Sequence, residues 1–313
     1  MTLSILLPVY ELDASALVSE LLALAEAEHV DCELLVGDDA SPTLVGWLDD
    51  IAYRQEVRVF RSEHNIGRAA NRNRLADAAK GDWLLTVDCD ARLLPQFSLR
   101  AYLRAARQAP VVCGGLCTPL TWPVRDSEPE TPLSQASHAS CQHDDDATRA
   151  LRLRYELNAD RYRSAEYRRR HPYDKFTLFN ALIRRDIFQD IRLDGSLKEY
   201  GYEDALFGID LQKRNIPIAH IDNPLLHTGI DTSNEFLQKT EASLHNLHHL
   251  QRQMTDHSRL LANANAICRW HLSIPTRLLF RLAAPLLRRN LLGKNPSMTL
   301  FSFYKLGYYL NIR

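Results

Sequence analysis

The chain has 313 residues, of which 45% are apolar and 25% charged, and its formal net charge is −1. This length and apolar content are sufficient for one large domain or two modest ones. They exclude a disordered tail, a collagen-like fibre and a small disulfide-stapled protein.

The charges are unevenly distributed along the chain. Asp256 is the last acidic residue, and the 57 residues after it carry nine Lys and Arg side chains. The part up to Asp256 holds 29 Lys and Arg side chains and all 39 acidic ones, a net charge of −10. The sequence therefore indicates an acidic body followed by a basic tail, and we expect no nucleic-acid partner.

The location is predicted from what the sequence lacks. Its six cysteines form no C-x-x-C pair, which indicates neither a disulfide framework nor a structural zinc site. The segment Met1–Pro8 does not resemble a signal peptide, and no apolar run approaches the roughly 20 residues of a spanning helix. We expect a cytoplasmic protein, with peripheral attachment to the inner face of the cell membrane as a further expectation.

The first 115 residues alternate short apolar runs with amphipathic segments. We expect strands at Leu3–Val9, Glu33–Val36, Val57–Arg61, Trp83–Val87 and Val111–Leu116. We expect helices at Asp13–Glu28, Gly67–Ala79 and Pro95–Gln108. Strands separated by helices predict βαβ units and a mostly parallel sheet, with a ligand site beyond the carboxyl ends of the strands.

The second part of the chain begins with a long polar segment, Thr118–Asp146, which we expect to be a functional or mobile loop, with Ser137–Asp146 as a lid over the donor. Its His138, Cys141 and His143 match no standard zinc spacing. Beyond it, helices are expected at Arg149–Arg170, Glu203–Arg214 and Asn234–Asn263, and strands at Phe176–Ile183 and Ile216–Ile221.

Acidic motifs follow two of the predicted strands. Asp88-Cys89-Asp90 comes directly after the fourth strand. Two carboxylates one residue apart suit a hard cation such as Mg²⁺ or Mn²⁺, although a solvated acidic turn is the commoner meaning of this motif alone. Asp38-Asp39 follows the second strand and has a similar alternative, because such residues also cap helices.

The arginines of a predicted helix also have two interpretations, a ligand-binding one and a structural one. Arg68 and Arg72 are four residues apart and therefore share one side of that helix. That side is either solvated or faces the oxygen atoms of a diphosphate, which the guanidinium group binds well. With an acidic metal site and the turn at Gly67 nearby, the pattern suggests a metal-bound nucleotide diphosphate.

Six short motifs follow one another in a fixed order. They are Pro8-Val9-Tyr10-Glu11, Asp38-Asp39-Ala40-Ser41, Asn65-Ile66-Gly67 to Asn71-Arg72-Asn73, Asp88-Cys89-Asp90, Tyr200-Gly201-Tyr202-Glu203-Asp204 and His227-Thr228-Gly229. In this order the sequence resembles a family-2 glycosyltransferase of the GT-A fold, over residues 1 to about 230.

The resemblance implies an α/β fold with a Rossmann-like, mostly parallel central sheet, flanking helices and a C-terminal helical extension. It implies inverting transfer of a sugar from a nucleotide-diphosphate sugar, with UDP as the family-level expectation. The acceptor would be a saccharide or a lipid-linked molecule in surface polysaccharide or glycan synthesis. Residues 1–115 would bind the nucleotide sugar, 116–232 would bind the acceptor and carry out catalysis, and 233–313 would form the basic extension.

The resemblance also implies residue roles. The donor would contact Pro8, Val9, Tyr10, Glu11, Asp38, Asp39, Arg68, Arg72 and Asp88. Mn²⁺ or Mg²⁺ would be bound by Asp90 directly and by His227, with Asp88 nearer the ribose and the waters of the metal. By itself, His227 would more often be an ordinary histidine at a strand end.

Glu203 and Asp204 supply the candidate base. An inverting transfer needs one carboxylate to accept the proton of the attacking hydroxyl. We assign Asp204 as the base and Glu203 as a partner that binds acceptor or sugar, and the reverse assignment stays open. Acidic residues are also common at a helix N-terminus for structural reasons alone.

The basic tail shows an amphipathic pattern. Arg277, Arg281 and Arg288 fall within about 40° on a helical wheel. Apolar residues occupy the other side, namely Leu278, Leu279, Phe280, Leu282, Leu286 and Leu287. Two interpretations stand side by side. The leucines pack on the body, or residues 269–313 contact an anionic membrane surface.

Two other functions are weighed against the transferase. A catalytically inactive scaffold that binds sugar nucleotides would lack a base or a metal ligand, whereas Asp88, Asp90, Asp204 and His227 are all present. A nucleotidyltransferase would need a glycine-rich phosphate loop near the N-terminus, and Pro8-Val9-Tyr10-Glu11 contains no glycine.

Overall fold

The computed structural model describes residues 2–43, 46–120, 147–174, 176–196 and 201–312. Most of the expected loop at Thr118–Asp146 lies outside the described residues, with His138, Cys141 and His143, and so does Tyr200.

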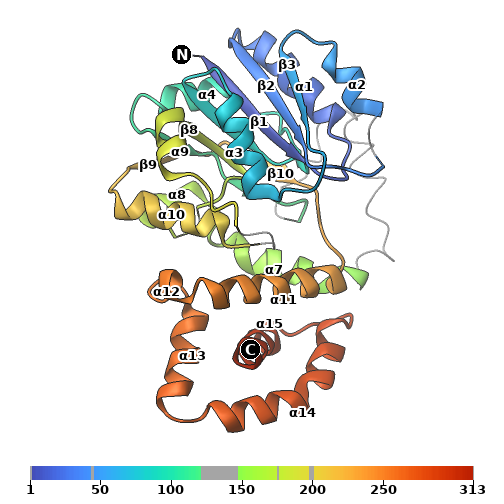
Figure 1. Ribbon diagram of the computed structural model, residues 1–313, viewed down its shortest axis with the longest axis vertical. Helices are drawn as coiled ribbons and strands as arrows, with labels where there is room; N and C mark the ends of the chain where they lie inside the picture. The colour runs from blue at the N-terminus through green and yellow to red at the C-terminus, as the bar shows by residue number, and fades with distance from the viewer. Residues whose placement is uncertain (1, 44–45, 121–146, 175, 197–200, 313) are drawn as a thin grey trace. The chain divides into compact units, whose positions relative to one another are not determined.

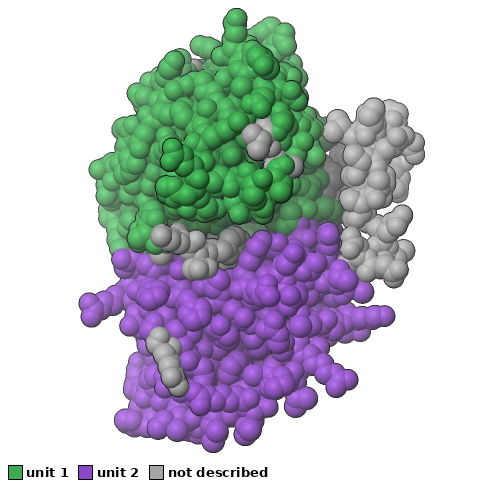
Figure 2. All heavy atoms as spheres, turned by 45° about the vertical axis from the view of Figure 1, so that its right-hand side comes forward, with its two compact units in different colours: residues 1–119, 160–198, 203–229 green, residues 120–159, 199–202, 230–313 purple. Residues whose placement is uncertain are grey.

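The chain forms two compact units, which Figure 2 distinguishes by colour. The first comprises Met1–Pro119, Asp160–Lys198 and Glu203–Gly229, and the second comprises Leu120–Ala159, Glu199–Tyr202 and Ile230–Arg313. The functional division predicted at residues 115/116 and 232/233 stays a prediction.

The first unit is built on a seven-stranded sheet of order β3-β2-β1-β4-β8-β6-β9. In that order the strands are Val57–Arg61, Cys32–Asp38, Leu3–Val9, Trp83–Val87, Asn180–Arg184, Val111–Cys113 and Ile218–His220. Neighbouring strands are parallel except where β8 pairs with β4 and β6. The predicted mostly parallel sheet is confirmed. A smaller sheet has the order β5-β10-β7, from Ala91–Arg92, Leu225–His227 and Leu116–Cys117.

Helices cover both faces of the large sheet. One face packs against α1 (Ser15–Ala27), α2 (Gly46–Ala52) and α4 (Leu99–Ala105). The other packs against α3 (Arg68–Ala78), α9 (Arg185–Ile191) and α10 (Glu203–Lys213). The strand β1 explains this layering, because its successive side chains point to opposite faces and all of its residues are buried. A strand buried on both faces appears as a nearly continuous apolar run, as Leu3–Val9 does.

The second unit is helical. Figure 1 shows α15 (Met298–Asn311) end-on, surrounded by α11 (Ser233–His249), α13 (Arg259–Arg269) and α14 (Ser273–Leu291). α7 (Ala150–Asp160) and α12 (Gln251–Met254) also belong to it, whereas α8 (Ala165–Arg170) belongs to the first unit. Its core contains Leu151, Phe236, Leu237, Leu291, Phe301 and Tyr304. None of the described helices is long and apolar enough to cross a lipid bilayer.

Two predicted helices are divided in the structure. The segment Arg149–Arg170 forms α7 and α8, because the Ser164 side chain accepts a hydrogen bond from the Tyr167 N–H and begins a new helix. The segment Asn234–Asn263 forms α11, α12 and part of α13, and Ser258 caps α13 in the same manner. The predicted strand Phe176–Ile183 begins as β8 only at Asn180.

Candidate active site

Several strands of the large sheet end at one rim, as the polar motifs predicted. Asp38 is the last residue of β2, and Asp88 directly follows β4. The antiparallel strand β8 begins at this rim, because Asn180 pairs with Val87. The Asp88 N–H donates to the Phe179 carbonyl oxygen at 3.3 Å and ties the two segments together. The rim therefore joins residues from distant parts of the sequence.

Arg72 is the buried cation of this rim, with 1% of its side chain exposed. Its Nη2 pairs with Asp88 Oδ1, and its Nη1 lies 3.9 Å from Asp204 Oδ1. The helix α3 is fixed there because the Asn71 amide donates to the Gly37 carbonyl oxygen at 2.7 Å. Arg72 Nε and Nη1 have no hydrogen-bond partner among the described residues. These N–H groups are suited to bind the oxygen atoms of a phosphate.

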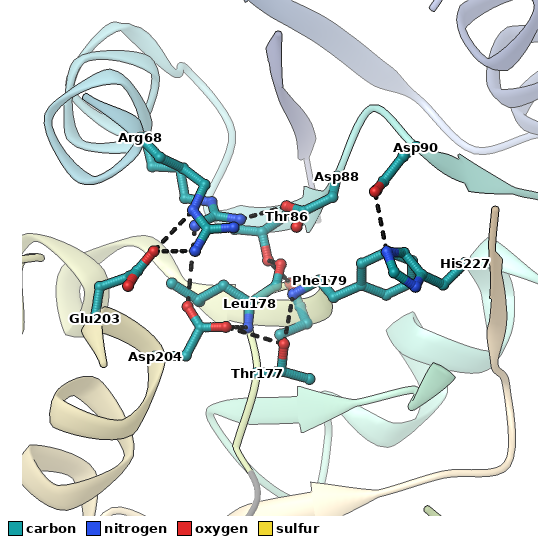
Figure 3. A network of polar contacts seen from close by, with 12 residues as sticks. Arg68, Thr86, Asp88, Asp90, Thr177, Leu178, Phe179, Glu203, Asp204 and His227 are labelled. Carbon is teal, nitrogen blue, oxygen red and sulfur yellow. Dashed lines mark hydrogen bonds and ion pairs between the residues drawn. The ribbon is translucent and has the colours of Figure 1, made fainter. Parts of the chain in front are cut away.

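The two oxygens of Asp204 have different surroundings (Figure 3). Oδ2 accepts a hydrogen bond from the Thr177 hydroxyl at 3.0 Å and from the Leu178 N–H at 3.1 Å. Oδ1 is buried and has no hydrogen-bond partner within the described part of the chain. Burial raises the pKa of this carboxyl, although Arg72 opposes that shift. Asp204 thus has one oxygen fixed by two donors and one, 3.9 Å from Arg72 Nη1, that accepts no hydrogen bond from the described residues, and its pKa is raised.

Glu203 is held differently from its neighbour. Its Oε1 accepts from Arg68 Nε at 2.7 Å and also pairs with Arg68 Nη2. Burial by itself would raise the pKa of Glu203, but the Arg68 guanidinium outweighs it, and the pKa lies below the usual value. The pKa values of these two adjacent carboxyl groups are therefore shifted in opposite directions, and the raised pKa of Asp204 favours it over Glu203 as the proton acceptor.

Asp90 and His227 form the second polar group of the site. His227 Nε2 and Asp90 Oδ2 are 3.0 Å apart, and the two side chains face each other in Figure 3. The small sheet brings them together, since His227 pairs with Ala91 across β10 and β5. A Cβ atom on Gly229 would collide with Asp90 Oδ2, so glycine keeps this position open.

A divalent cation fits part of this group. A carboxylate and an imidazole are a suitable donor pair for Mn²⁺, which takes its other ligands from water and phosphate. The described residues contain no cluster of three or more His, Cys, Asp or Glu side chains that could hold a metal by itself. Asp88, the third predicted ligand, is paired with Arg72 instead. Asp90 and His227 are a donor pair that fits a cation, and the metal roles of Asp88, Asp90 and His227 stay predictions.

The predicted nucleoside-binding aspartates already have partners. Asp39 accepts hydrogen bonds from the Ile66 N–H at 2.8 Å and the Gly67 N–H at 3.0 Å, just before α3 begins. Asp38 accepts from the Ser41 N–H at 3.2 Å. Both carboxylates are buried and organise the loops around them. Their contact with a nucleobase stays a prediction.

The end of β1 contributes in two ways. Pro8 and Val9 are buried in the sheet, and Val9 pairs with Asp38 at the rim, so their contact with a donor stays a prediction. Tyr10 is 48% exposed, and Glu11 has a positive φ of 50° and donates its N–H to Ser41 Oγ at 2.8 Å. Tyr10 and Glu11 are therefore the members of this motif whose side chains remain available to a donor.

Sequence reasoning missed Thr177 and Leu178. They were assigned to a strand because Phe176–Ile183 is largely apolar. In the structure their backbone lies outside the sheet, and the Leu178 N–H donates a hydrogen bond to Asp204. The Leu178 carbonyl oxygen accepts a hydrogen bond from the Thr86 hydroxyl at 2.6 Å. The one signal was a hydroxyl residue, Thr177, interrupting an apolar run.

Comparison with known proteins identifies the family. The family model described as glycosyl transferase family 2 matches residues 4–192, more than half of the chain. This chain belongs to glycosyl transferase family 2. An uncharacterized glycosyltransferase of Haemophilus influenzae is 37% identical over 95 residues, which are 30% of this chain and 31% of that protein.

A solved structure with a TM-score above 0.5 supports the fold of this family-2 member. The mannosyltransferase PcManGT of Pyrobaculum calidifontis, solved with GDP-Man and Mn²⁺, matches 98% of this chain and 84% of its own, with a TM-score of 0.52 and 13% identity. S. aureus TarS 1–349, solved with UDP, matches 77% of this chain and 64% of its own, with a TM-score of 0.48 and 17% identity. The predicted GT-A fold is confirmed.

Proposed function

We propose that this family-2 member transfers a sugar, with inversion, from a UDP-sugar to a hydroxyl of a saccharide or lipid-linked acceptor. The observation that carries the proposal is the asymmetry of Asp204, which has one oxygen fixed by two donors and the other without a hydrogen-bond donor among the described residues. A carboxylate oriented in this way is prepared to accept one proton from one direction.

Asp204 accepts the proton of the acceptor hydroxyl in the proposed step. The hydroxyl oxygen attacks the anomeric carbon as the bond from that carbon to the UDP oxygen breaks. The electron pair of this bond leaves with UDP, and the new glycosidic bond has the opposite configuration. The step forms no covalent intermediate with the chain, so it needs no nucleophilic side chain.

The donor diphosphate would be bound by Arg72 and Arg68. Arg72 Nε and Nη1 donate no hydrogen bond to the described residues, and Arg68 can exchange its contact with Glu203 for a phosphate oxygen. A divalent cation, Mn²⁺ or Mg²⁺, held by Asp90 and His227 would supply further neutralisation of the leaving group. Relatives solved with UDP and with GDP-Man motivate testing both nucleotide families as donors.

The test compares Asp204→Asn with Asp210→Asn, a matched change on the same helix at a partly exposed aspartate. Asp204→Asn should retain UDP affinity by calorimetry and lose glycosyl transfer by at least about 100-fold, whereas Asp210→Asn should keep both. Transfer by Asp204→Asn at the wild-type rate would show that Asp204 is not the base.

The same assay separates the alternatives. An inactive scaffold would bind nucleotide sugars without consuming them in the presence of Mn²⁺ and a panel of acceptors. A nucleotidyltransferase would instead form nucleotide sugar from a sugar 1-phosphate and a nucleoside triphosphate. A screen of UDP- and GDP-sugars, read as released nucleoside diphosphate, identifies the donor.

A further inference from the structure

The helix α14 has two apolar faces. One packs inside the second unit, where Phe280 lies 5.5 Å from the Tyr304 ring, measured between centroids. Gly307 of α15 leaves room for Phe280, because a Cβ atom there would collide with its ring. Leu287 packs against the same core and Leu291 is part of it. The sequence left open whether the apolar side of this helix packs on the body or faces outward, and in the structure Phe280 and Leu287 face the core.

The other face of α14 is exposed. Its large aliphatic residues, which we call the α14 stripe, are Ile274, Leu278, Leu279, Leu282 and Leu286. They are between 59% and 76% exposed, and they span about 140° on a helical wheel. Trp270, just before the helix, is 75% exposed as well. Leucines are rarely exposed in such a row on a protein without a partner for them.

The charges beside the α14 stripe are all positive. Arg277 and Arg281 border it on one side, and Arg289 lies within it near the end of the helix, all exposed. Arg288 is different, because it pairs with Glu241 of α11 at 2.9 Å and is directed inward. Residues 257–313 contain no Asp or Glu. The exposed leucines thus lie beside exposed arginines, and the tail contains no acidic residue that could neutralise these arginines.

We propose that the α14 stripe docks on an anionic phospholipid surface, with α14 lying in the plane of the headgroups. A bilayer interface supplies phosphate oxygens for the arginines and acyl chains for the leucines along the whole helix, about 28 Å. Trp270 is of the type that prefers this interface. A second copy of this chain fits less well, since face-to-face pairing would bring arginines together without acidic partners.

The experiment measures flotation of the full chain with two kinds of vesicle, phosphatidylcholine alone and phosphatidylcholine mixed with phosphatidylglycerol. No donor is added, so the result does not depend on the proposed reaction. Leu278→Gln/Leu282→Gln/Leu286→Gln removes the centre of the stripe, and Arg277→Gln/Arg289→Gln removes charge. Tyr53→Gln/Leu157→Gln is the matched control, because these apolar residues are 87% and 55% exposed elsewhere.

Wild-type protein and the control should float with the anionic vesicles only. The leucine variant should lose at least about tenfold in partitioning, and the arginine variant should lose its preference for anionic lipid. Circular dichroism spectra and thermal unfolding midpoints should match those of the wild type in all variants, which shows that they are folded. Wild-type protein that fails to float, or a leucine variant that floats equally well, overturns the proposal. Concentration-dependent dimers abolished by the leucine changes, without flotation, would assign the stripe to a second copy.

Discussion

Thr177 donates its hydroxyl hydrogen to Oδ2 of Asp204 at 3.0 Å, and in turn accepts a hydrogen bond from the Phe179 N–H at 3.1 Å. The Thr177 hydroxyl therefore has a fixed direction, and it fixes the plane of the Asp204 carboxylate. A side chain that the sequence assigned to a strand acts as a positioning residue for the proposed base.

Thr177→Val should lower kcat more than it changes the KM for the donor, because it removes a contact to the base and none to the proposed diphosphate site. It should also move the acidic limb of the kcat/KM profile upward, since a hydrogen bond to a carboxylate stabilises its charged form and lowers its pKa. Thr177→Ser keeps the hydroxyl and should restore both properties. A Val variant with an unchanged pH profile would falsify the positioning role.

The wild-type enzyme should itself show an acidic limb above the ordinary aspartate range. Burial raises the pKa of Asp204, so its active, charged form is lost at a higher pH than that of a solvated aspartate, about 4. Activity should fall as the pH decreases through this raised pKa. A kcat/KM profile that stays flat down to the ordinary aspartate value would contradict the assignment.

Arg72→Met should destabilise the fold and weaken donor binding together. Asp88 would lose its buried partner, at a cost of about 3–5 kcal/mol in the free energy of unfolding. The KM for the nucleotide sugar should rise by about tenfold or more, because the guanidinium group offers the unpartnered N–H groups. Arg72→Lys should restore little, since a lysine cannot make two parallel bonds. Denaturant unfolding and donor kinetics measure both effects.

Gly229→Ala should raise the Mn²⁺ concentration needed for half-maximal activity. The added methyl group meets Asp90 Oδ2 and forces that carboxylate to shift. Gly46→Ala is the control, because a Cβ there meets nothing within 4 Å. If both variants show the same metal titration as the wild type, Asp90 does not hold the cation at this position.

The stability of the first unit should fall in mild acid because of His220. Burial lowers the pKa of this imidazole from 6.5 to about 4, and its Nδ1 faces Arg168 Nη1 at 3.1 Å. The unfolded chain binds the proton below pH 6.5 and the folded chain does not, so stability decreases from pH 6.5 toward 4, by up to about 3 kcal/mol. His220→Gln should remove this part of the pH dependence, measured by thermal unfolding at a series of pH values.

The sheet could be predicted closely where an apolar run ends in a turn. β1, β3 and β4 have the predicted bounds, since each is an apolar or alternating run that gives way to polar residues, and β1 and β4 are buried along their whole length. The start of β8 could not be predicted, because Thr177 leaves the strand to meet Asp204 on another element. In the tail, periodicity indicated an amphipathic helix, but it did not tell which leucines face the core. Gly307 decides this by making space for Phe280, and it is 27 residues further along the chain.

The reversed direction of β8 has a mechanical consequence. Asn180 pairs with Val87, so the ladder between β8 and β4 sets how far Thr177 lies from Asp88. A shift of one residue would turn the side chains of β8 to the opposite faces of the sheet and move the preceding segment, with Thr177, by about 3.3 Å. Inserting or deleting one residue between Thr177 and the start of β8 would therefore displace Thr177 from Asp204. The chain could remain folded while its proton acceptor loses its alignment with the sugar.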